Sequence, residues 1–304
     1  MHKIIQGPKV TWIDIQNPTQ EDIDFLKENN GFHPLVLDEL IPPAWRTKVE
    51  AFPSYLFFIS YFAAWSKEHK HTRPREIDVI VGKNILVTCH YNSIVPLKAL
   101  FDACNLYEDK RREYMSQGGG LLLFHAMDAM RQNTLIKIDR ISKKLHHIEE
   151  QIFLGHERQM LQEISYAKAD IINFWRIVHP QGEILESLQK QGKDFFGPDL
   201  DPYFSRLLGD WSQSRNTLET FKESIEALEA TNNSLLAEKT NEIVKVLTIV
   251  SASVLPLTLL AGLFGMNTEH TPLMGMPGDF WILVGVMVLG VFLLVAYFKH
   301  KKWL

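Results

Sequence analysis

Hydrophobic and polar positions change their pattern twice along the 304-residue chain. From Val10 to about Asn105, short apolar runs alternate with turn signals, which is typical of strands. After the three glycines at 118–120, apolar residues recur every three to five positions, which predicts long helices. Residues 246–298 then carry almost no charge. These three patterns, in this order, predict an α/β domain of mixed topology, a set of long α-helices and two apolar segments at the C-terminus.

Proline and glycine divide the helical part of the chain. A first long helix follows the three glycines, a second is expected over roughly 158–189, and the glycines and prolines of 191–202 require a turn. From Tyr203 onward no proline occurs until Pro256. We therefore expect one helix of about 60 residues, on the order of 90 Å long, that leads into the first apolar segment.

The two apolar segments, 243–264 and 280–298, each match the roughly 20 residues needed to cross a bilayer. Lys245 is the one charge in the first segment, and the second has none. Neither segment has a polar face, which argues against two buried core helices of a soluble protein. Both are predicted to be transmembrane helices.

Charges beside these segments predict the topology. The tail after Phe298 is basic, whereas 265–279 contains no Lys or Arg, so the positive-inside rule places both termini in the cytosol and the loop outside. The N-terminus lacks the apolar core of a signal peptide. We expect a multi-pass protein of the cell (inner) membrane. The predicted regions are an α/β domain (1–120), a long-helix region (121–242), a pore helix (243–264), an external loop (265–279), a second span (280–298) and a cytosolic tail (299–304).

Composition excludes several other classes. Cys89 and Cys104 form no CxxC pattern, so neither a disulfide framework nor a zinc knuckle is expected. A membrane-anchored enzyme is the alternative from another class, but no nucleophile, paired-carboxylate or phosphate-loop motif supports it. We expect no enzymatic activity, no organic cofactor and no nucleic-acid partner.

A short motif stands where the first predicted span ends, Gly265-Met266-Asn267. Together with the preceding run from Pro256, it resembles the signature of the CorA family of magnesium transporters. The resemblance is strong over the last 65 residues or so and diffuse before them. Further matching segments are 240–248, 297–304, Trp12-Ile13-Asp14, His33-Pro34-Leu35 and Lys48-Val49-Glu50.

The resemblance implies a homopentamer around a central pore in the lipid bilayer. Asn267 would then form a ring of five amides, presented by the Gly265 turn together with Met266. Mg2+ gives up its water reluctantly, so neutral oxygens spaced for the hydrated ion suit a selectivity filter, and the ion would be held through water. We expect passive uptake of divalent cations, chiefly Mg2+ and also Co2+ or Ni2+.

One face of the first apolar helix is a candidate pore lining. On a helical wheel, small, polar and apolar residues gather on one side. Leu247 and Leu255 would form apolar rings that gate by dewetting, and Asn241 and Thr258 polar rings. The alternative is an ordinary helix-packing stripe of small residues. The predicted lining is Asn241, Val244, Leu247, Ser251, Leu255, Thr258 and Gly262.

The driving force and the ion stay open to alternatives. No ATP-binding loop occurs, and two charges moving through 100 mV release about 4.6 kcal/mol, so the membrane potential suffices. Related proteins with Gly-Val-Asn move zinc, so a transporter of zinc or another transition metal on the same scaffold is the alternative. Met266 favours magnesium.

Regulation is where this sequence departs from the family. Acidic residues between subunits sense cytosolic Mg2+ in the family, and counting back from Asn267 without gaps puts Arg206 at the sensing aspartate. Asp210, one turn later, is the nearest carboxylate. We expect closure by cytosolic Mg2+ to be weakened or to rely on Asp210. Two other possible metal motifs, His146 with Glu150 and residues 68–71, are interpreted as solvated surface.

Overall fold

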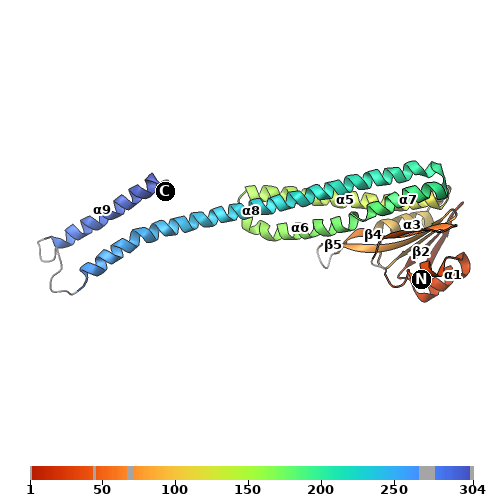
Figure 1. Cartoon of the computed structure of the whole chain (residues 1–304), viewed down its shortest axis with the longest axis horizontal. Coiled ribbons are helices and arrows are strands. Elements are labelled where there is room, and N and C mark those ends of the chain that lie inside the picture. Colours follow the sequence, from red (N-terminus) through yellow and green to blue (C-terminus); the bar gives the residue numbers. More distant parts are fainter. Residues whose placement is uncertain (1, 44–45, 67–70, 267–277, 302–304) are drawn as a thin grey trace. The chain divides into compact units, whose positions relative to one another are not determined.

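The computed structural model describes residues 2–43, 46–66, 71–266 and 278–301. The chain divides into two compact units, Met1–Ala230 and Thr231–Leu304. The first holds a sheet and its covering helices, and the second holds two apolar helices (Figure 1). One helix, α8, contributes to both units.

The sheet of the first unit has six strands in the order β1-β2-β6-β5-β4-β3. All neighbouring strands are antiparallel except β2 and β6, which pair in parallel. The predicted mixed topology is thus confirmed. The strands are β1 (His2–Gln6), β2 (Thr11–Gln16), β3 (Lys48–Ala51), β4 (Tyr55–Ser66), β5 (His71–Gly82) and β6 (Ile85–His90).

Helices cover both faces of this sheet. Because side chains alternate along a strand, Trp12 and Phe58 join the core on one face, and Ile13 and Phe57 the core on the other. The second of these cores is closed by α1 (Gln20–Asn30) and α2 (Pro34–Asp38). The first is closed by α3 (Val95–Leu106), α4 (Glu108–Met115), α5 (Gly119–Phe153), α7 (Gln181–Phe196) and the start of α8 (Asp201–Phe264).

The long helices agree with the sequence except at one break. The second predicted helix is two helices, α6 (Glu157–Val178) and α7, because Pro180 lacks the N–H that would continue α6. A short 3-10 turn, Pro198–Leu200, then leads into α8. The final helix is α9 (Asp279–His300). The prediction of strands up to about Asn105 is wrong over α3, which has Pro96 in its first turn.

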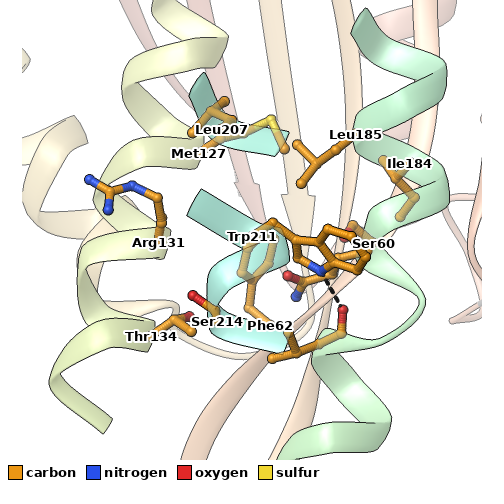
Figure 2. Close-up of a pocket in the computed structure, with 12 residues that line it drawn as sticks. Ser60, Phe62, Met127, Arg131, Thr134, Ile184, Leu185, Leu207, Trp211 and Ser214 are labelled. Carbon is orange, nitrogen blue, oxygen red and sulfur yellow. Dashed lines mark hydrogen bonds between the residues drawn. The ribbon is translucent and has the colours of Figure 1, made fainter. Parts of the chain in front are cut away.

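A glycine lets α7 and α8 approach closely. A Cβ atom at Gly182 would lie 2.2 Å from the Trp211 ring, so any larger residue would displace that ring. Trp211 stays in place because its Nε1 donates a 2.7 Å hydrogen bond to the carbonyl of Val178 (Figure 2). The start of α8 is therefore fixed against the soluble unit.

Asp78 is a carboxyl group buried in the middle of the sheet. It lies on β5 between Ile59 and Cys89 and is fully buried. Neither of its oxygens has a hydrogen-bond partner among the described residues. Burial raises the pKa of Asp78 to about 8, and the negative charges of Glu76 and Glu39 add to the shift.

This pKa predicts a measurable pH dependence of stability. Since the folded state binds the Asp78 proton more tightly than the unfolded state, the contribution is present at low pH and is lost as pH rises from about 4 to about 8, by at most about 1.4 kcal/mol per pH unit. Asp78→Asn in the full-length protein should flatten the fall in unfolding temperature between pH 5.5 and pH 8. The exposed Asp139→Asn variant is the control, and an unchanged slope in Asp78→Asn would contradict the assignment.

Candidate ion pathway

The predicted pore lining is an exposed stripe on the second half of α8. Val244, Leu247 and Leu255 are 53%, 63% and 67% exposed, although all three are apolar. Asn241, Ser251, Thr258 and Gly262 on the same helix are exposed as well. The structure therefore leaves the whole stripe uncovered within one chain.

The covered side of this helix faces α9. Leu257 and Phe264 line hollows of about 400 and 510 Å3 together with residues of α9 such as Met287. At about 100° per residue, this side is centred more than about 120° from the stripe. The stripe thus points away from the other described helix of its unit. The more covered residues are Lys245, Ile249, Ala252, Ser253, Leu257, Leu260 and Phe264.

The hydroxyl of Thr258 on the stripe is disposed to accept a hydrogen bond. The hydroxyl of Thr258 donates to the carbonyl of Val254 at 3.0 Å, so its lone pairs remain for a donor such as the water around a cation. The apolar side chains of Leu247 and Leu255 alternate with the oxygens of the stripe along the helix. Such a surface can contact hydrated cations without stripping their water.

The described part of the Gly265-Met266-Asn267 motif ends the helix. The amide of Gly265 donates to the carbonyl of Ala261 at 2.9 Å, and a Cβ atom there would lie 3.0 Å from that same oxygen. The last carbonyls of α8 give this end a partial negative charge, which favours cations. Asn267 and most of the predicted external loop lie outside the described residues.

Both apolar helices meet the requirements for membrane spans by length and composition. Their most apolar windows have mean hydropathies of 2.1 and 2.6, and no residue of those windows is buried. Core helices of soluble proteins would be covered. The two helices instead expose a large apolar surface, and contact of so large an apolar area with water is unfavourable.

The residues expected to sense Mg2+ form an ion-pair network in the first unit. Asp210 lies 3.4 Å from Nε of Arg131 on α5 and 3.8 Å from Nε of Arg206 on its own helix. Arg131 also binds Asp128 at 2.7 Å. Arg131 could not be predicted from the sequence, because it is far from Asp210 along the chain. Two guanidinium groups already neutralise the carboxylate considered as a sensor.

The other possible metal ligands stay apart or exposed. His146 is 71% exposed and lies 3.3 Å from Glu150 in a surface i,i+4 pair. Across the described ranges no three His, Cys, Asp or Glu side chains are grouped to hold a metal ion. The exposure of both side chains agrees with the interpretation of His146 and Glu150 as surface, while residues 68–70 lie outside the described residues.

A covered α/β unit whose last helix, α8, continues into the first of two uncovered apolar segments is the architecture of a membrane protein with a large domain outside the bilayer. The model of one family, the CorA-like Mg2+ transporter proteins, matches residues 8–300. The chain belongs to this family. Membership places it among transporters rather than enzymes, so the anchored-enzyme alternative is set aside.

Named relatives resemble the chain over almost its whole length. The cobalt/magnesium transport protein CorA of Thermotoga maritima is 27% identical over 97% of this chain and 83% of its own. A putative metal ion transporter of Bacillus subtilis is 23% identical over 98% of this chain and 92% of its own. The structure of the CorA magnesium transporter from Methanocaldococcus jannaschii superposes with a TM-score of 0.84 at 21% identity, covering 97% and 92% of the two chains. This last likeness confirms the fold.

The ion-pair network predicts the effect of removing Asp210. In Asp210→Asn, Arg131 loses one of its two carboxylates while only 16% exposed, so the unfolding temperature should fall by a few degrees, roughly 1 kcal/mol. The control Asp139→Asn breaks an exposed i,i+4 pair with Lys143 and should change little. A stabilisation by Mg2+ that Asp210→Asn abolishes would instead identify Asp210 as a magnesium ligand.

Proposed function

We propose that this chain is one subunit of a passive channel for divalent cations, chiefly Mg2+, with Co2+ and Ni2+ as further permeant ions. The observation that carries the proposal is the stripe on α8 that faces away from α9. A stripe of hydroxyl, amide and small apolar groups on one helix cannot enclose a path by itself. Several copies around an axis could do so, and family membership favours that use of this helix.

A homopentamer would complete the pore. Five copies of Asn267 would then form the selectivity filter beyond Gly265 and Met266, with amide oxygens that accept hydrogen bonds from the water around Mg2+. The support for this step is the motif itself and the negative end of α8 from which it extends. Relatives named as magnesium and cobalt transporters fit the same choice of ions.

The apolar members of the stripe would provide the gate. Rings of Leu247 and Leu255, each more than half exposed in one chain, would exclude water when the helices draw together. Asn241, Val244, Ser251, Thr258 and Gly262 would line the rest of the path. With both termini in the cytosol of the cell, the inside-negative potential drives divalent cations inward without ATP.

The alternative is a transporter of zinc or another transition metal. Zinc prefers thiolate and imidazole ligands. No cysteine or histidine occurs between residues 241 and 264, where the stripe lies. Oxygen and apolar groups along the path favour a hard, hydrated cation, which supports magnesium.

Asn267→Ala tests the filter. Removing the amide should abolish selective Mg2+ uptake into proteoliposomes under an imposed potential, because no other amide stands at that turn. The oligomer should remain intact by size-exclusion chromatography, since in the proposed filter the side chain would contact the hydrated ion and not the fold. Asn29→Ala, which truncates an exposed amide in α1, is the control and should transport normally.

Uptake should be compared for Mg2+, Co2+, Ni2+ and Zn2+ with and without a pH gradient. Undiminished Mg2+ uptake by Asn267→Ala would reject the filter. Uptake of Zn2+ alone, driven by protons, would favour the alternative.

Two serines on opposite sides of α8 test the pore lining. Ser251 lies on the stripe, whereas Ser253 lies on the side toward α9 and donates to the carbonyl of Ile249 at 2.8 Å. With mild oxidation, Ser251→Cys should form disulfide-linked dimers between subunits and Ser253→Cys should not. The natural Cys89 and Cys104 are both buried and should give little background. Cross-links through Ser253→Cys alone would show that the side of α8 with Ser253, and not the stripe, faces the axis, and would reject the pore lining.

A further inference from the structure

A hollow of about 350 Å3 in the first unit belongs to no part of the ion pathway. It lies between the strands β4 and β5, the start of α3 and the middle of α5. Three cationic side chains line it, Arg75 from β5 and Lys137 and Arg140 from α5. We call this hollow the basic pocket.

The positive charge of the basic pocket is not balanced by its own lining residues, although Lys137 and Arg140 also line a second hollow that contains Asp170 of α6. None of its lining residues is acidic. Arg75 and Arg140 make no ion pair with any carboxylate in the described part of the chain, and the ammonium group of Lys137 donates to the carbonyl of Ala63. The chain as a whole has a net charge of -4, so a local excess of positive charge is not expected from its composition. Three unpaired cations in one concavity are arranged to receive an anion.

The start of α3 adds to this field. Val95 and Pro96, the first residues of that helix, line the basic pocket. The helix has no side-chain cap and no acidic residue in its first turn. Pro96 has no N–H, so the start of α3 offers a negative group the amide of Val95 and the positive end of the helix dipole.

The remaining walls suit more than a bare ion. Phe62, Ile94 and Met130 supply apolar surface, and Ser93, Asn133 and Thr134 supply neutral polar groups. The volume lies at the lower end of the range for small-molecule sites. A single phosphate would fill only part of it, which leaves space for an attached organic group.

We infer that the basic pocket binds a phosphate ester of small-molecule size, with its phosphate groups held by Arg75, Lys137, Arg140 and the start of α3. Arginine pairs with phosphate through two parallel hydrogen bonds, and lysine contributes a point charge. The apolar wall would cover the organic part. This site would let an anionic metabolite act on the soluble unit of a cation channel.

Lys137 gives the binding a characteristic pH dependence. The pKa of Lys137 is lowered to about 8, mainly by burial; Asp170 of α6 opposes the shift, and Arg140 on the same helix adds to it. Arg75 faces the same hollow from β5. A bound phosphate would favour the charged amine, so affinity should fall as pH rises from 7.5 to 9, where phosphate esters are already fully ionised.

Calorimetric titration of the purified full-length oligomer with ATP, pyrophosphate, inorganic phosphate and adenosine, in EDTA without divalent cations, tests the inference. ATP or pyrophosphate should bind, and adenosine should not. Arg75→Gln and Arg140→Gln should each weaken binding about tenfold or more. Lys143→Gln removes an exposed cation on the same helix that is paired with Asp139, and it should bind as the natural protein does.

Several results would overturn the inference. These are no binding of any phosphate compound at about 10 mM, binding unaffected by both arginine variants, or adenosine binding that phosphate does not compete with. Equal loss in Lys143→Gln would indicate a general charge effect and would also reject the site. Arg140 is exposed and has no ion-pair partner among the described residues, so its variant should fold. Mg2+ transport by each variant can be measured separately, so failure of this site leaves the proposed channel untouched.

Discussion

The structure depends on one constraint, that a backbone in hydrocarbon must satisfy its own hydrogen bonds. α8 meets it by staying helical for 64 residues from the first unit through the apolar segment, except at Pro256, which has no N–H to donate to the carbonyl of Ala252. Its beginning is buried by packing, with Phe204 1% and Leu218 0% exposed, whereas its end leaves Leu247 63% exposed. The same regular helix therefore joins a water-soluble fold to a surface that requires lipid or other subunits.

Features set by composition or period could be predicted from the sequence. The two spans and the long α8 need only apolar length and the lack of breaking residues, and the strands β4, β5 and β6 follow from β-branched and aromatic runs. The errors came at two prolines, Pro96 in the first turn of α3 and Pro180 between α6 and α7. α3 reads as another apolar run until its helix is seen, and the break before α7 depends on the one residue Pro180. β1 has an ordinary polar and apolar mixture and is defined by its pairing with β2.

The candidate site also has features that the sequence predicts and features that only the structure shows. A helical wheel places Leu247, Ser251 and Thr258 together, but it cannot say which side of the helix is free. That needed the position of α9, whose residues share hollows with Leu257 and Phe264. The role of Asn267 still rests on its motif. The ion pair of Arg131 with Asp210 and the convergence of Arg75 with Arg140 join residues far apart in the chain, and no local pattern predicts such pairs.

Electrostatics near Asp210 bear on how such a channel could be controlled. With Arg131, Arg206 and Asp128, this carboxylate forms a network of two positive and two negative charges. A divalent cation about 4 Å from a single guanidinium meets a repulsion of about 8 kcal/mol at an effective dielectric constant near 20, and one carboxylate offsets only the equivalent of one guanidinium. The network therefore already has the charge that a bound metal would supply. The carboxylate that could bind Mg2+ reversibly is here paired with arginine, which stays charged at every physiological pH. Control of the soluble unit is then better suited to an anion, because the basic pocket offers unpaired positive charge whereas the network around Asp210 leaves no unpaired negative charge.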